Sequence, residues 1–95
     1  MAATITNGPC KMDLMLALFD ASNDRPRPLV FSVMRGSAGS EAITVHVSSV
    51  QREGGSGESF NITALWQSKT DGGSFNVVMY YSTKTRTGYA TPIRQ

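Results

Sequence analysis

The sequence predicts an α+β domain in which one N-terminal helix precedes a five-stranded antiparallel meander that is strongly curled or closed into a small barrel. The meander is indicated by residues 42–82, where three runs rich in β-branched and aromatic residues are separated by two glycine-rich turns, the usual sequence form of strands joined by hairpins. The helix is indicated by residues 10–24, which lack β-branched residues and are mostly good helix formers. A length of 95 residues with 40% hydrophobic content suits a single domain, residues 1–95, with one core.

The segment over residues 9–21 is predicted to be a buried helix, with Pro9 at its first position. Its apolar residues recur at the spacing i, i+3, i+4, i+7, which makes one stripe that we expect to face the core. The stripe consists of Met12, Met15, Leu16 and Phe19, and Leu14 and Leu18 widen it. The alternative is a strand over residues 11–20 with Met12, Leu14, Leu16 and Leu18 on one face. Residue propensities favour the helix over this strand.

Five runs are predicted to be strands because each is rich in β-formers and ends at a turn signal. They span residues 29–35, 42–52, 59–67, 75–82 and 89–93. The last is expected to be a short edge strand, where Pro92 is tolerated. In the second run the valine at position 50 has the opposite parity to Ile43, Val45 and Val47. A β-bulge at Ser48–Ser49 would return Val50 to the core side and bend the strand.

The order of one N-terminal helix and five meandering strands is similar to that of small SH3-like or Sm-like barrels. The resemblance covers topology alone, and no Sm sequence motif is present to transfer a binding residue. It implies a curled or closed sheet and assigns no function.

Composition favours a cytoplasmic protein without disulfides. Cys10 is the single cysteine, so it has no partner within the chain, and we expect it to be a buried structural residue. The longest apolar stretch, Leu14–Phe19, is too short to cross a membrane, and no basic segment followed by an apolar run begins the sequence. A net charge of +2 and a pI near 9.0 permit anionic partners without requiring them. No metal or cofactor is expected.

Catalysis is not indicated by any residue pattern. His46 is the single histidine and is expected on the outward side of its strand, whereas a general base needs a matched partner within reach. Glu53 and Glu58 flank a glycine-rich loop, where solvated carboxylates lack the burial that tunes an acid for proton transfer. The chain is therefore expected not to be an enzyme.

A basic and aromatic hairpin near the C-terminus is the candidate binding site. It contains Tyr80, Lys84, Arg86 and Tyr89, and interleaved cations and aromatic rings bind single-stranded nucleic acid through phosphate contacts and base stacking. The alternative interpretation is a cationic turn that guards an edge strand against aggregation.

The predicted function is that of a small non-enzymatic binding or interaction domain that self-associates. Apolar residues such as Val78 and Tyr80 fall on the second side of the predicted sheet, which one helix cannot cover. The expected partners are a second copy of the chain and an unidentified protein or small molecule, and no membrane is expected. Weak binding of nucleic acid through residues 80–89 is the alternative, and a small enzyme comes third.

Overall fold

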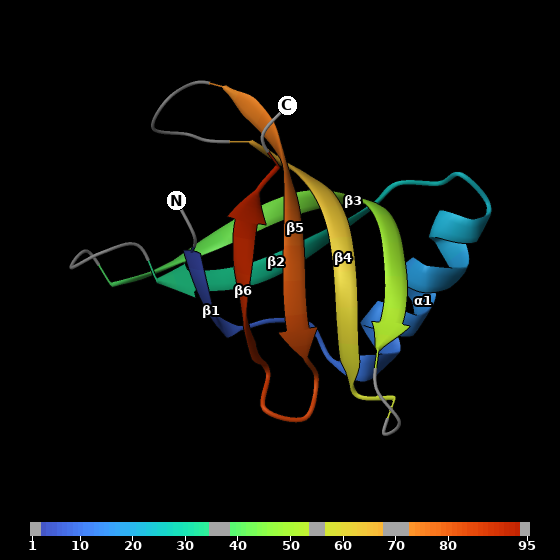
Figure 1. The fold of residues 1–95 in the computed structure, drawn as a ribbon, viewed down its shortest axis with the longest axis horizontal. Helices are drawn as coiled ribbons and strands as arrows, with labels where there is room; N and C mark the ends of the chain where they lie inside the picture. The colour runs from blue at the N-terminus through green and yellow to red at the C-terminus, as the bar shows by residue number, and fades with distance from the viewer. Residues whose placement is uncertain (1–2, 35–38, 54–56, 68–72, 94–95) are drawn as a thin grey trace.

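The computed structural model describes residues 3–34, 39–53, 57–67 and 73–93, and within them six antiparallel strands form a closed barrel that one helix covers at its side (Figure 1). The elements in chain order are β1 (Ala3–Asn7), α1 (Lys11–Ser22), β2 (Arg27–Met34), β3 (Ser40–Glu53), β4 (Ser59–Gln67), β5 (Ser74–Ser82) and β6 (Thr87–Pro92). Each strand pairs with its neighbours in this order, and β6 returns to β1. The prediction of a small α+β barrel with a meander is confirmed, but the barrel has six strands rather than five.

The strand that sequence reasoning missed is β1, which closes the barrel. Thr4 lies opposite Met34 of β2 on one side and Tyr89 of β6 on the other. Only Ile5 of this five-residue strand is a buried aliphatic residue, so the local pattern is too weak to indicate a strand. The prediction that β6 is an edge strand is also wrong, because β1 pairs with it and closes the barrel. Pro92 is nevertheless tolerated, because β1 pairs with β6 only as far as Ala90.

The other strands match their predicted positions closely, and β4 has the predicted bounds. Along each strand the side chains alternate between the barrel interior and the outside, as the period of two in a pleated strand requires. The predicted bulge is confirmed, because the register between β3 and β4 shifts between Val47 and Ser49 and Val50 is buried. The interior is filled by Ile5, Leu29, Phe31, Val33, Ile43, Val45, Val47, Val50, Phe60, Ile62, Ala64, Trp66, Val77, Met79, Tyr81 and Ala90.

The helix prediction is confirmed by α1, but only part of the apolar side that was expected to face the core does so. Met15 and Leu18 pack against the core, whereas the other three residues of the expected stripe are exposed. Leu14 and Ala17 are buried against the barrel, whereas Met12 and Phe19 are each 67% exposed and Leu16 is also exposed. Apolar residues surround this helix, so periodicity alone does not select the inward side. The buried side of the helix is the one that packs against the barrel, where α1 lies mainly against β3.

The connection from β1 to α1 is held against the barrel by two side chains from the β5–β6 hairpin. The buried Tyr81 hydroxyl donates a hydrogen bond to the Pro9 carbonyl at 2.8 Å. The Arg86 guanidinium donates from Nε to the Gly8 carbonyl at 3.0 Å and from Nη2 to the same oxygen. A Cβ at Gly8 would come within 2.8 Å of the rings of Phe31 and Tyr81, so only glycine fits here.

Replacing Tyr81 with phenylalanine is expected to lower the free energy of unfolding by about 1–2 kcal/mol, because the buried Pro9 carbonyl loses its donor. The matched control is Tyr80→Phe, which removes the same atom from an exposed ring on the same strand and is expected to cost less than about 0.5 kcal/mol. Urea unfolding followed by tryptophan fluorescence measures both. Equal effects of the two substitutions would show that the Tyr81 hydroxyl does not hold the connection.

Candidate functional site

Among the residues that the structure describes, one side of the barrel carries no charged side chain. The outward residues of β1, β4, β5 and β6 form what we call the uncharged face. It consists of Thr4, Asn61, Thr63, Leu65, Asn76, Val78, Tyr80, Tyr89 and Thr91. Soluble surfaces usually have about a quarter to a third of their residues charged. The composition of this face therefore differs from that of an ordinary solvated surface.

The centre of the uncharged face is a pair of stacked tyrosines. Tyr80 and Tyr89 are opposite each other on β5 and β6, with ring centroids 5.8 Å apart and planes inclined by 21°. The row continues to Asn61 on β4 and Thr4 on β1, and Val78 lies in the next row between Thr63 and Thr91. Such a cross-strand aromatic pair stabilises a sheet by about 0.5–1 kcal/mol. Tyr80 is still 38% exposed and Tyr89 54% exposed, so both rings present surface to a partner.

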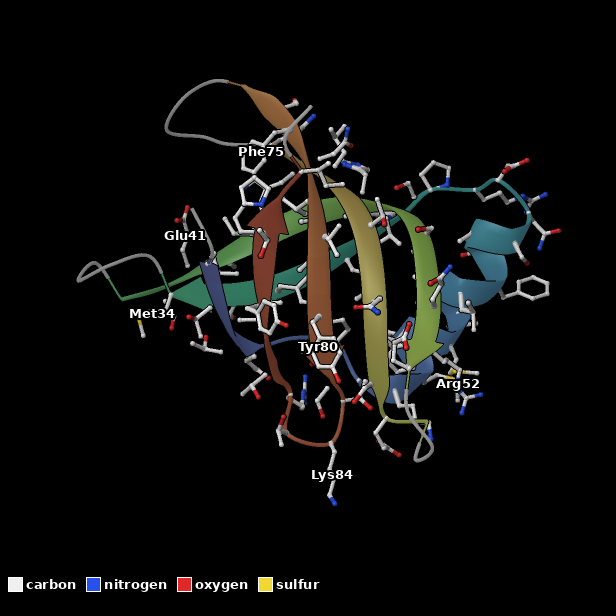
Figure 2. The ribbon with its side chains drawn as sticks, in the orientation of Figure 1. Met34, Glu41, Arg52, Phe75, Tyr80 and Lys84 are labelled. Carbon is white, nitrogen blue, oxygen red and sulfur yellow. The ribbon has the colours of Figure 1, made fainter. Side chains whose placement is uncertain are left out.

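The four residues of the predicted binding hairpin do not form one cluster. Tyr80 and Tyr89 are brought together on the uncharged face, while Lys84 lies at the tip of the β5–β6 turn (Figure 2). Arg86 ends this turn with a left-handed φ of 59° and directs two of its N–H groups at the Gly8 carbonyl. A guanidinium used in this way has fewer donors for a phosphate. The hairpin therefore offers an aromatic surface with less positive charge beside it than the sequence suggests.

Within the described ranges, the charged residues lie on α1, in turns and near the ends of strands. Figure 2 shows Glu41 and Arg52 near opposite ends of β3 and Lys84 at the β5–β6 turn, all away from the middle of the sheet. Sequence reasoning did not identify the uncharged face, because its members come from four strands. The alternation within each strand shows which of its residues point outward. Only the register between the strands shows that these outward residues lie side by side.

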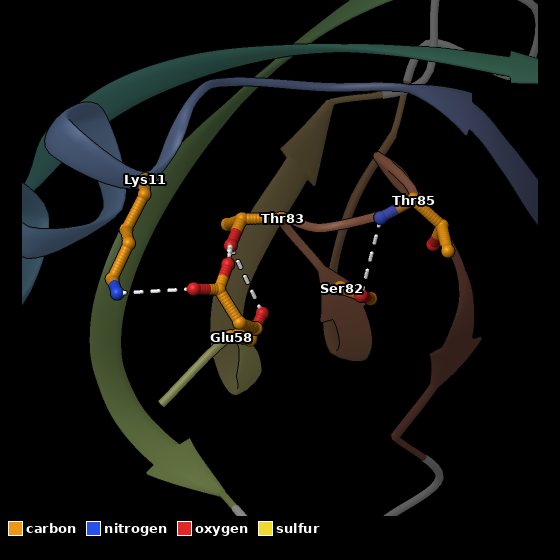
Figure 3. A network of polar contacts seen from close by, with 5 residues as sticks. All are labelled: Lys11, Glu58, Ser82, Thr83 and Thr85. Carbon is orange, nitrogen blue, oxygen red and sulfur yellow. Dashed lines mark hydrogen bonds and ion pairs between the residues drawn. The ribbon is translucent and has the colours of Figure 1, made fainter. Parts of the chain in front are cut away.

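Glu58 links three parts of the fold at the end of the barrel where β4 begins (Figure 3). Its carboxylate accepts a hydrogen bond from the Thr83 hydroxyl at 2.9 Å and an ion pair from Lys11 Nζ at 3.1 Å. Its backbone carbonyl accepts the Thr83 N–H at 2.8 Å. The interpretation of Glu58 as a solvated charge beside a loop missed this network. The carboxylate connects the first turn of α1 to the β5–β6 turn, so its role is structural.

The hydrogen bond from Thr83, and then the one from Lys11, lower the pKa of Glu58 below its ordinary value of 4.5. A carboxylate with a lowered folded-state pKa stabilises the fold above its unfolded-state pKa, and this contribution is lost as the pH falls through the folded-state value. We expect Glu58→Gln to be less stable than the parent protein at pH 7, with the difference shrinking below about pH 4.5. Urea unfolding across pH 2–7 measures it, and Glu53→Gln from the same hairpin is the control. A difference independent of pH would contradict an ionic role.

Two reactive residue types lie far apart in the fold. His46 is exposed on the outward side of β3, as predicted, opposite Pro28 and Leu65. The prediction that Cys10 is buried is wrong, because it is exposed at the N-cap of α1, where its thiol donates to Asp13 Oδ2 at 3.3 Å. Leu14, one turn after Cys10, fills the core instead.

We expect the exposed Cys10 thiol to react with a chromogenic disulfide reagent in the native protein at a rate of the same order as in the denatured chain. Stopped-flow absorbance with and without urea gives the two rates, and Cys10→Ser provides the blank. Labelling that occurs only after denaturant is added would contradict the exposed position.

Within the described ranges, no group of three His, Cys, Asp or Glu side chains is placed to hold a metal ion. Among the same residues, α1 is too short to cross a membrane and no other helix is present that could. Comparisons with protein-family models, with curated proteins and with solved structures gave no match for this chain.

Proposed function

We propose that the chain is a non-enzymatic interaction domain that associates with a second copy of itself through the uncharged face. The observation that carries the proposal is the pair of exposed tyrosines, Tyr80 and Tyr89, on a four-strand surface without a charged residue. The centres of protein interfaces are depleted in charged residues and enriched in tyrosine. A second copy is the partner that fits, because two identical uncharged faces bring together no like charges and leave no charge without solvent.

The size of the face points to a weak dimer. Four strands spaced about 4.8 Å apart make a surface about 19 Å wide, and the distance from Asn76 to Tyr80 along β5 is about 14 Å. The resulting planar area, about 270 Å², is well below the roughly 600–1,000 Å² per partner that specific interfaces bury. Association is therefore expected in the micromolar range, with the two tyrosines contributing most of the affinity.

The alternative of nucleic-acid binding has less support. Stacking on Tyr80 and Tyr89 would serve it, but phosphate contacts require several cations, and Arg86 is directed to the Gly8 carbonyl. An enzyme is supported least, because His46 and Cys10 lie on different elements and neither lies on the uncharged face.

The test is the molar mass of the protein over a concentration series. Light scattering after size exclusion is expected to show the mass rising above the chain mass of 10.2 kDa as the concentration increases. Tyr89→Lys places a charge at the centre of the face and is expected to weaken association by at least about tenfold. The control is Thr44→Lys, which adds the same charge to an exposed outward position of β3, outside the face.

Two outcomes would refute self-association through this face. One is a mass of 10.2 kDa at every concentration, and the other is an equal effect of the two lysine substitutions. Fluorescence anisotropy with single-stranded RNA at low salt separates the alternative, since binding that weakens with salt and is lost in Lys84→Ala would support the nucleic-acid interpretation.

A further inference from the structure

Strand pairing around the barrel is incomplete between the first part of β2 and the chain that follows β1, a region that we call the seam. β3 pairs with the whole of β2, from Arg27 to Met34. β1 pairs only with the last three residues of β2, Ser32–Met34. Within the described ranges, the edge of β2 over residues 27–31 therefore has no strand partner on the side away from β3.

Two observations establish which backbone groups of β2 point into the seam. The Ser32 carbonyl accepts a hydrogen bond from the Thr6 hydroxyl, so it points towards β1. Pro28, four residues earlier, has the same parity and lacks an N–H, which is the arrangement found where a strand residue faces away from its ladder partner. Val30 lies between them with the same parity. Its N–H and C=O and the C=O of Pro28 therefore point into the seam.

A groove of about 420 Å³ runs along these groups. Residues 7–9 form the opposite wall, and Arg27, Asp13 and Arg86 are among the charged residues that line it. Val30 is 55% exposed, which is unusual for a valine in the middle of a strand. Arg27 is held at 2.6 Å by Asp20, so it is fixed at one end of the groove.

The seam is kept open by the hydrogen bonds that hold the chain after β1. Tyr81 binds the Pro9 carbonyl and Arg86 binds the Gly8 carbonyl, so the chain is held at the barrel wall instead of continuing beside β2. A longer β1 would fill the seam with the protein's own strand. The groove therefore lies between two parts of the chain that are both held in place, β2 and residues 7–9.

We propose that the seam binds an extended peptide segment as an added strand, which exchanges two backbone hydrogen bonds with Val30 and donates a third to the Pro28 carbonyl. Unpaired edge groups spaced at the strand period are what an extended backbone recognises. A short peptide of β-branched residues fits best, because the groove gives no charge preference: Arg27 is paired with Asp20, and Arg86 binds the Gly8 carbonyl. This site lies outside the uncharged face and does not depend on the self-association proposed above.

Hydrogen exchange measured by NMR tests the seam itself. In the protein alone we expect the Val30 amide to exchange at least about tenfold faster than the Leu29 and Phe31 amides, which bond to β3 in the same strand. Equal protection of the three amides would show that the Val30 N–H is already paired, and it would overturn the proposal.

The ligand class is tested with the synthetic peptide acetyl-Glu-Thr-Val-Thr-Glu-amide, titrated to a few times about 1 mM into labelled protein. We expect shifts at Val30 and its neighbours and slower exchange of the Val30 amide. An analogue with an N-methyl group on the central valine is expected to bind at least about tenfold more weakly, because it cannot donate to β2.

The matched protein variants are Val30→Pro, which removes the N–H that points into the seam, and Val30→Ala, which keeps it. Only the proline variant is expected to lose peptide binding, and circular dichroism checks that both remain folded. The proposal is overturned if the peptide causes no shifts at Val30, if the methylated analogue binds equally well, or if a folded Val30→Pro variant retains full affinity.

Discussion

The hydrogen bonds from Tyr81 and Arg86 to the Pro9 and Gly8 carbonyls are the interaction on which the rest of the structure depends. They turn the chain away from β2 after a strand of only five residues and start α1 at the side of the barrel. Because Tyr81 packs edge-on against Phe31 in the core, with centroids 5.4 Å apart, this link is anchored in the interior. The barrel can then close with a short β1, and the helix covers the part of β3 that extends past β2.

Closure also explains how the barrel can have an uncharged side. In an open sheet, lysine and proline at the edges prevent pairing with other chains. Around β4, β5 and β6 every strand has a partner on both sides, so edge protection is not needed there and the outward positions can be neutral. Within the described ranges, the charges lie on α1, in turns and near strand ends, and Glu58 binds Lys11 and Thr83. The outward positions of the uncharged face are therefore occupied by tyrosine, valine, leucine, threonine and asparagine.

Strong local patterns predicted much of this fold from the sequence. The bounds of β4, the bulge after Val47 and the existence of α1 all follow from alternation, parity and propensity within one segment. The predictions that were wrong concern features that depend on residues distant in the sequence. β1 is a strand because β2 and β6 lie beside it, and the inward side of α1 is set by the barrel wall against which Leu14 and Ala17 are buried. Of the candidate site, the two tyrosines were identified in sequence, but the role of Arg86 required knowledge of the chain near Gly8.

At the seam, the edge of β2 is protected against unlimited pairing with other chains but keeps a few backbone groups that a short strand could bind. Pro28 and the ion-paired Arg27 occupy the first part of the β2 edge, which is the position where charge and proline stop long strands from pairing without limit. Their effect is to confine pairing to the groups around Val30, since Pro28 can accept a hydrogen bond but not donate one. A partner at this edge must therefore be short, and its register is set by the residue opposite Val30. The exposed side chain of Val30 and the groove beside it are the features of this edge that an added strand would contact.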